Sequence, residues 1–268
     1  MLPRVNMIRT DNTDYLLFST DDLISRYIHT LGQWESANLL IAELFCEGVD
    51  MPLVLDVGAN LGAFAVPLAQ KLMPREGLVY CFEPQRVIFY QLCANIFLNR
   101  LDCCIANHVA ISDQEGILKL TDIDYAQSSN IGGYSLVDDY RERTNSTIVT
   151  TNALVHNVPI RTLDSFDFPR PVSLLKIDVE GMELNVLKGA EILLRASSYP
   201  PIMFKAWDVE WFKEQRSELL AYVEGLGYEL FFLNEMDVIA QHKLSQRLYK
   251  FVVDPTSNTL SYYVVEQS

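Results

Sequence analysis

The sequence predicts an α/β domain in which helices cover both faces of a mostly parallel sheet. From about residue 53 onward, short apolar runs alternate with longer amphipathic stretches, which is the order that produces such a sheet. The first run ends in a glycine turn, as expected for a strand buried on both faces. With 268 residues, 49% of them hydrophobic and 21% charged, the chain can bury a sizeable core.

Seven strands alternate with helices along this part of the chain. Leu53 to Val57 is a continuous apolar run, and Val79 to Phe82 repeats it before Pro84, a residue that suits the first position of a helix. Pro67 lies inside the first expected helix and predicts a kink there or a late start. The expected strands are 53–57, 79–82, 105–111, 174–179, 202–204, 228–233 and 248–253, and the expected helices are about 62–72, 85–99, 182–195 and 208–226.

Two segments stand outside the alternation. Residues 1–50 are expected to form an N-terminal cap on the main domain of residues 51–268, with a strand pair near 5–8 and 15–18 and helices near 21–29 and 34–46. The stretch at about 112–168 is an insert between the third and fourth strands, with turn signals in its sequence. Because ligands of open α/β sheets bind beyond the carboxyl ends of the strands, we expect this insert to form the substrate wall.

Composition argues against several classes of partner. The net charge of −14, without a concentrated basic patch, disfavours nucleic acid. No apolar run reaches the roughly 18 residues that a membrane-spanning helix needs, and the N-terminus lacks the apolar core of a signal peptide, so we expect no membrane insertion and a cytoplasmic location. The five cysteines and four histidines have no zinc-binding spacing and predict no Cys/His metal site.

The first strand leads into a candidate ligand-binding loop. Asp56, Gly58, Asn60 and Gly62 follow this strand at alternate positions and open a helix, so that the glycines allow a ligand to approach the backbone closely. A tight strand-to-helix connection without a ligand is the alternative. The dinucleotide pattern G-x-G-x-x-G would need glycines at 60 and 63, where this chain has Asn60 and Ala63. A pyrophosphate site is therefore disfavoured.

An acidic residue ends the next strand. Glu83 lies where a carboxylate can accept hydrogen bonds from both hydroxyls of a nucleoside ribose. Together, Asp56 and Glu83 suit a cationic sulfonium cofactor better than a cofactor that carries phosphate.

Three segments resemble the FkbM family of S-adenosylmethionine-dependent methyltransferases: Val54 to Gly62, Phe82 to Pro84, and Leu175 to Glu183 with its Lys-Ile-Asp-Val-Glu-Gly core. The resemblance covers about residues 30–235. It implies a Rossmann-like class I methyltransferase fold, with a seven-stranded sheet whose last strand is antiparallel. It also implies the cofactor S-adenosylmethionine and an acceptor hydroxyl on a sugar, glycolipid or polyketide-type natural product.

The resemblance also assigns cofactor-binding positions. It implies that Asp56, Gly58, Asn60 and Gly62 surround the methionine part, that Glu83 holds the ribose, and that the end of the third strand, including Ala110, lies near adenine. Glu35 in the cap matches a position where the family often has glutamate. A solvated helix face is the alternative for Glu35.

Two acids follow the fourth strand and are the candidate catalytic residues. A positioned carboxylate can take the proton of a hydroxyl acceptor during methyl transfer, and Asp178 is the first choice for this base, with Glu180 beside it. Either acid could instead cap the next helix, and Glu180 is better suited to do so. Asn130 and Ser135 of the insert are candidates for orienting the acceptor, although Asn-x-Gly-Gly is also an ordinary turn.

The chain departs from the family pattern after the fifth strand, where Lys205 stands in place of the usual glutamate. We expect Lys205 either to pair with Asp178 and lower its basicity, to bind an acidic acceptor, or to form an ordinary ion pair at the rim. Trp207 could stack on a sugar or belong to the core. Whether Asp178 and Glu180 also hold a divalent metal is left open by the sequence.

The sequence therefore predicts a methyltransferase that uses S-adenosylmethionine to methylate a hydroxyl group of a small molecule or glycan. A catalytically impaired methyltransferase-like binding protein is the main alternative. An enzyme that uses NAD or a nucleotide sugar is a weaker one.

Overall fold

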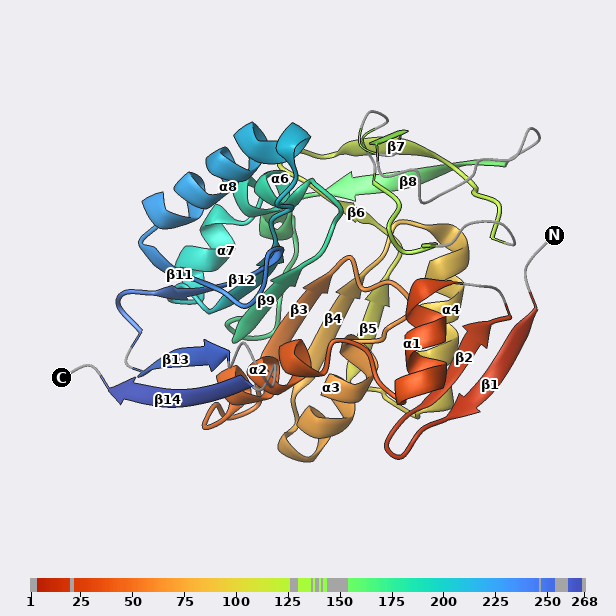
Figure 1. Cartoon of the computed structure of the whole chain (residues 1–268), viewed down its shortest axis with the longest axis horizontal. Coiled ribbons are helices and arrows are strands. Elements are labelled where there is room, and N and C mark those ends of the chain that lie inside the picture. The colour runs from red at the N-terminus through yellow and green to blue at the C-terminus, as the bar shows by residue number, and fades with distance from the viewer. Residues whose placement is uncertain are drawn as a thin grey trace.

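A seven-stranded sheet forms the centre of the computed structural model, which describes residues 4–19, 22–125, 130–135, 137, 140, 142–143, 154–245, 247–253 and 260–266 (Figure 1). The strand order is β11-β12-β10-β9-β3-β4-β5. β12 runs antiparallel to both of its neighbours, while β10, β9, β3, β4 and β5 are parallel to one another. The strands are β3 (Leu53–Val57), β4 (Leu78–Phe82), β5 (Cys104–Asn107), β9 (Leu174–Ile177), β10 (Ile202–Lys205), β11 (Tyr228–Phe232) and β12 (Asp237–His242).

The seventh strand of the sheet differs from the one that the sequence predicted. The expected strand at 248–253 lies in β13 (Arg247–Val253), which pairs, among the described strands, with β14 (Leu260–Glu266) alone and forms a two-stranded sheet apart from the main one. The antiparallel strand of the main sheet is β12 instead. Its sequence, Asp-Val-Ile-Ala-Gln-His, has an apolar run of three residues that ends in two polar ones, although its last five residues are buried.

The third strand is shorter than predicted. β5 ends at Asn107, whereas the predicted strand continues to Ile111. Residues Ala110–Ile111 form β6, which leaves the main sheet and pairs in parallel with β8 (Val155–Arg161). β8 also pairs antiparallel with β7 (Gly116–Thr121), so that part of the predicted insert is a second, three-stranded sheet. Residues 126–129, 136, 138–139, 141 and 144–153 of the predicted insert lie outside the described residues.

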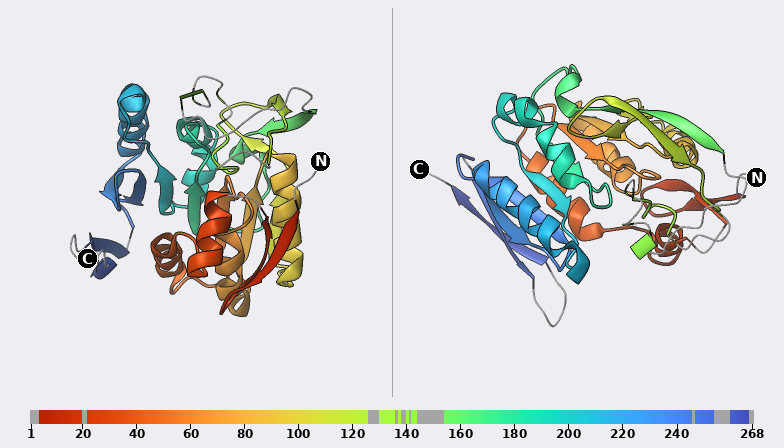
Figure 2. Two further views of the ribbon diagram at one scale, coloured as in Figure 1. Left: turned by 45° about the vertical axis from the view of Figure 1, so that its right-hand side comes forward. Right: turned by 90° about the horizontal axis from the view of Figure 1, so that it is seen from above.

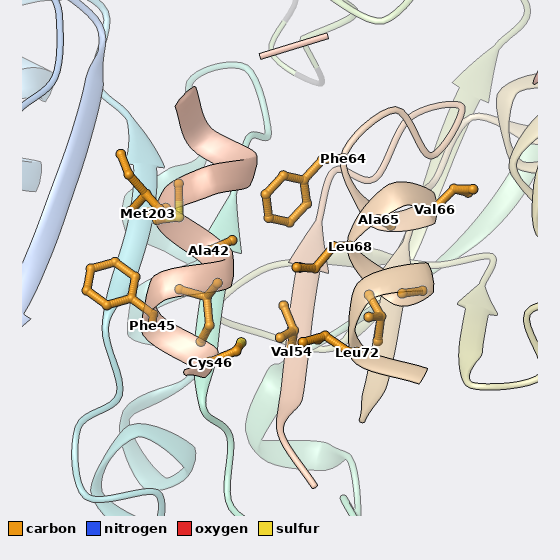
Figure 3. Close-up of a cluster of buried hydrophobic side chains, with 14 of the residues drawn as sticks. Ala42, Phe45, Cys46, Val54, Phe64, Ala65, Val66, Leu68, Leu72 and Met203 are labelled. Carbon is orange, nitrogen blue, oxygen red and sulfur yellow. The ribbon is translucent and has the colours of Figure 1, made fainter. Parts of the chain in front are cut away.

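Helices cover both faces of the main sheet (Figure 2). α2 (Ser36–Cys46) and α3 (Ala65–Leu72) bury their apolar side chains against one face, together with Leu92 of α4 (Arg86–Leu98); Figure 3 shows part of this core. α6 (Glu183–Lys188), α7 (Glu191–Ala196) and α8 (Lys213–Gly225) cover the other face. Short 3-10 turns occur at η1 (Met73–Arg75), η2 (Leu163–Ser165) and η3 (Glu210–Phe212).

Two helices differ from a simple reading of the sequence. α3 starts late, at Ala65, which places Pro67 in the first turn, where its missing N–H has no intrahelical partner to lose. This is one of the two outcomes that Pro67 predicted. The single helix expected at 182–195 is instead two, α6 and α7, with Gly189 between them. A Cβ atom at Gly189 would lie 2.1 Å from the carbonyl oxygen of Ser112, so the chain there has no room for a side chain.

The N-terminal segment packs against α4. β1 (Val5–Arg9) and β2 (Asp14–Phe18) form an antiparallel hairpin, and β2 contacts α4. Asn95 of α4 accepts a hydrogen bond from the backbone N–H of Leu16 at 2.7 Å and donates one to the carbonyl of Leu61 at 2.8 Å. α1 (Leu23–Leu31) follows and is capped by Asp22, which accepts from Ser25 N–H. Among the described helices, none is long and apolar enough to cross a membrane.

Candidate functional site

A cavity of about 780 Å³ opens at the carboxyl ends of β3, β4, β9 and β10. This is the edge of an open α/β sheet where ligands are expected. The segments that follow these four strands all line the cavity, together with the start of α2, part of α1 and residues of the predicted insert. The predicted site residues that line it are Glu35, Gly58, Asn60, Glu83, Ala110, Asn130, Asp178, Glu180, Lys205 and Trp207.

Three predicted site residues lie behind the wall of the cavity. Asp56 is fully buried, and its Oδ1 accepts a hydrogen bond from Lys176 Nζ at 3.0 Å. A Cβ atom at Gly62 would lie 2.8 Å from a methyl carbon of Val66, so this glycine serves the packing of the chain into α3. Ser135 is buried, and its hydroxyl accepts from the backbone N–H of residue 137 at 3.2 Å.

The loop after β3 is fixed by its neighbours. Gly58 has φ +83°, and a Cβ atom there would lie 1.9 Å from the carbonyl oxygen of Asp178, so only glycine lets the loops after β3 and β9 approach this closely. Glu83 at the end of β4 accepts hydrogen bonds from Asn60 N–H at 2.9 Å and Gln85 N–H at 2.8 Å. Burial raises the pKa of Glu83 to about 7, although these two N–H groups oppose the shift.

The turn at residues 130–133 closes the side of the cavity next to the loop after β3. A Cβ atom at Gly132 would lie 1.8 Å from Asn60 Nδ2, so the turn packs directly on the loop after β3. The backbone N–H of Ile131 donates to Asp22 Oδ1 at 3.1 Å, while the other oxygen of Asp22 caps α1. One aspartate therefore joins the cap helix to the insert.

Lys205 lies between two carboxylates. Its Nζ is 2.9 Å from Asp178 Oδ2 and 3.8 Å from Glu35 Oε1, and 17% of the lysine side chain is exposed. Burial would raise the pKa of Asp178, but the ammonium groups of Lys205 and Lys176 hold it below its usual value. Of the alternatives open in the sequence, the geometry shows the ion pair with Asp178. Glu35 faces this pair and is not on a solvated helix face.

The pKa of Glu180 is shifted in the opposite direction to that of Asp178. Burial, followed by the negative charge of Asp178, raises the pKa of Glu180 to about 8. Its backbone has φ +54°, a conformation that side-chain-bearing residues rarely adopt. The two acids that follow β9 therefore differ in character, with Asp178 held ionised by its lysine and Glu180 titrating near neutral pH.

Two residues of the site were not among those predicted. Lys176 lies within the apolar strand β9, and its ammonium pairs with Asp56 and lies 5.1 Å from the centre of the Phe64 ring. Glu183 accepts hydrogen bonds from the backbone N–H groups of Val179 and Gly181, both at 3.2 Å. Glu183 therefore holds the turn that precedes α6, and burial raises its pKa to about 7. The capping role considered for Glu180 is not observed, because the N-cap of α6 is Met182 and makes no side-chain hydrogen bond.

Trp207 borders the cavity but is mostly covered. Only 7% of the residue is exposed, and its ring packs against Trp211 and Phe212 with centroid separations of 5.5 and 5.2 Å. Tyr140 adds a third ring at 6.0 Å. Most of the indole surface therefore belongs to an aromatic cluster beside the cavity. No group of three or more His, Cys, Asp or Glu residues arranged to hold a metal ion occurs in the described part of the chain.

The strand order, the antiparallel β12 between β10 and β11, and the cavity beyond the parallel strands together define a Rossmann-like class I methyltransferase fold. The chain matches the methyltransferase FkbM domain over residues 56–230 and belongs to the FkbM methyltransferase family. The family resemblance of the sequence is thereby confirmed. No curated protein sequence matches the chain significantly.

Several solved methyltransferase structures are distantly similar. The methyltransferase FkbM of Methylobacillus flagellatus is 15% identical with a TM-score of 0.43, and the match covers 72% of this chain but only 44% of that one. A SAM-dependent O-methyltransferase of Thermotoga maritima is 13% identical, with a TM-score of 0.44 and coverage of 97% and 72%. A precorrin-6y C5,15-methyltransferase of Geobacter metallireducens is 12% identical, with a TM-score of 0.44 and coverage of 76% and 87%.

Proposed function

We propose that the chain transfers the methyl group of S-adenosylmethionine to a hydroxyl group of a sugar, glycolipid or related natural product. The observation that carries this proposal is that the three sequence segments that resemble the family line one and the same cavity. Glu180 and the ion pair between Lys205 and Asp178 line it too. Its volume of about 780 Å³ is within the range of about 300–1,000 Å³ that is common for small-molecule sites.

The residues after β3 and β4 fit the proposed cofactor. Gly58 keeps the floor of the cavity free of a side chain, and Glu83 presents a carboxylate at the end of β4. Each oxygen of Glu83 accepts one backbone N–H and keeps a lone pair for a ribose hydroxyl. Asp178 and Glu180 line the same cavity, and an ionised carboxylate attracts a cationic sulfonium. S-adenosylmethionine, when bound, would supply an electrophilic methyl group.

Glu180 is the better candidate for the general base. A base works best when its pKa is near the working pH, and that of Glu180 is raised to about 8. Asp178, which the sequence favoured, is kept ionised and weakly basic by its ion pair with Lys205. We therefore assign the removal of the acceptor proton to Glu180, and to Asp178 the task of holding Lys205 in place.

The experiment is methyl transfer from labelled S-adenosylmethionine into a pool of sugars, glycolipids and hydroxylated natural products, with Glu180→Gln as the matched variant. We expect the label in a methyl ether formed from one of the hydroxyl-bearing acceptors, and a loss of about 10²-fold or more in the variant. The ion pair that weakens Asp178 favours one other candidate, a binding protein without turnover. Reproducible absence of transfer across the pool, with S-adenosylhomocysteine still bound, would support that candidate.

A further inference from the structure

We propose that the ammonium group of Lys205 is the resident cation of the acceptor site, in the position between carboxylates that a divalent metal ion would otherwise take. The acceptor oxygen is then activated without a metal. This inference takes the identity of the acceptor from the proposed function. The geometry around Lys205 and the metal-binding test do not depend on which acceptor is methylated.

Two carboxylates from different parts of the fold lie close to the ammonium group of Lys205, and further acids line the same cavity. Asp178 follows β9 and lies 2.9 Å from the ammonium nitrogen, while Glu35 precedes α2 and lies 3.8 Å away. Asp237 of β12 is the register partner of Lys205 across the antiparallel pair and also lines the cavity. Glu180 also lines the cavity, so that these four acids share it with Lys205. Carboxylate oxygens are the ligands that a hard cation prefers.

The other ammonium group of the cavity is already in use. Lys176 Nζ is 3.0 Å from Asp56 Oδ1, behind the wall, and Phe64 covers it. The carboxylates around Lys205 therefore depend on Lys205 for their nearest positive charge. Even with Lys205 in place, Asp178 Oδ1 is buried and has no hydrogen-bond partner among the described residues. One oxygen of Asp178 is thus left without a donor from the described part of the chain.

The ammonium group has donors to spare for a ligand. Of its three N–H bonds, one donates to Asp178 Oδ2, and Glu35 at 3.8 Å is beyond hydrogen-bond distance. Lys205 lines the cavity and is partly exposed to it. A remaining N–H can therefore donate to an acceptor oxygen, which is the contact that a metal ion would make as a Lewis acid.

The chemistry balances without a metal. The acceptor oxygen forms a bond to the methyl carbon as the carbon–sulfur bond breaks, and that electron pair stays on sulfur. The hydroxyl proton passes to the carboxylate of Glu180. During this step the N–H of Lys205 stabilises the negative charge that builds on the acceptor oxygen.

The test is Mn²⁺ binding, measured by electron paramagnetic resonance in the presence of S-adenosylhomocysteine. Wild type should show no Mn²⁺ site that depends on Asp178. Lys205→Gln, which keeps the side-chain length and removes the charge, should gain one Mn²⁺ site at least about tenfold tighter than any in wild type, held by the carboxylates left around it. Adding Asp178→Asn to Lys205→Gln should abolish the gain.

Lys250→Gln is the matched control, because it removes the lysine of an exposed ion pair with Glu229 far from the cavity, and it should gain no site. Lack of Mn²⁺ binding by folded Lys205→Gln would overturn the proposal. If Lys205→Gln does not fold, Mn²⁺ binding is compared between wild type and Asp178→Asn. Equal Mn²⁺ binding by these two proteins supports the proposal, and an Mn²⁺ site that wild type has and Asp178→Asn lacks refutes it. Failure of wild type to bind S-adenosylhomocysteine would refute the proposed function instead.

Discussion

Glu180→Gln should change how the stability of the ligand-free protein depends on pH. The pKa of Glu180 is raised from a usual value of 4.5 to about 8 in the folded state, by burial and by Asp178. Between these values the folded protein binds a proton that the unfolded chain has released. The free energy of unfolding therefore falls as the pH rises through about 8. Glutamine cannot ionise and removes this contribution.

The size of the effect follows from the shift. At about 1.4 kcal/mol per pKa unit, Glu180 alone would lower the free energy of unfolding by roughly 2 kcal/mol between about pH 6 and about pH 8. Because Glu180 borders the cavity and solvent screens it in part, we expect about 1–2 kcal/mol. Glu83 and Glu183 titrate in the same range, but they do so in wild type and variant alike.

The assay is urea denaturation of wild type and Glu180→Gln across this pH range without ligand. Wild type should lose about 1–2 kcal/mol more than the variant as the pH rises. Glu224→Gln, on the exposed surface of α8, is the control and should follow wild type. Parallel pH profiles for wild type and Glu180→Gln would show that Glu180 does not titrate near neutrality, and the assignment of the base would then fail.

Two further predictions concern the walls of the cavity. Gly132→Ala places a methyl group 1.8 Å from Asn60 Nδ2 and should weaken S-adenosylhomocysteine binding by about tenfold or more in calorimetry. Gly225→Ala is the control and should leave the affinity unchanged, because nothing lies within 4 Å of the added methyl group. Equal affinities for the two variants would mean that the turn at 130–133 does not shape the site. Lys176→Met should lower the free energy of unfolding by about 3–5 kcal/mol, because it leaves Asp56 buried without its cation. Adding Asp56→Asn to this variant should restore most of the lost stability. If the two substitutions instead cause additive losses in urea denaturation, the ion pair does not stabilise the fold as described.

The parallel half of the fold could be predicted because each of its strands is a short apolar run. β12 could not, because its last two residues are Gln241 and His242, which are polar and yet buried. Tertiary partners make this possible. Gln241 bonds both the N–H and the carbonyl of Tyr249 at 2.7 Å, and His242 stacks on Tyr199 with centroids 4.4 Å apart. A local pattern does not reveal partners that come from other elements.

The site shows the same limit. Glycines in strand-to-helix turns and acids at strand ends can be recognised in the sequence, so most of the predicted residues do line the cavity. Lys176 could not, because it is enclosed in an apolar strand and its partner Asp56 lies 120 residues earlier. Glu183 looks like an ordinary acid at a helix start, and only the fold shows that it holds the turn beside Glu180. The ion pair of Lys205 was one of three readings until the fold placed Asp178 beside it.

Calorimetric titration with S-adenosylhomocysteine and with NAD, on wild type and on Glu83→Gln, tests the central claim most directly. Wild type should bind S-adenosylhomocysteine and not NAD. Glu83→Gln, which weakens a charged hydrogen bond to ribose, should lose about tenfold or more in affinity. Tight binding of NAD without binding of S-adenosylhomocysteine would contradict the proposed cofactor and the mechanism built on it.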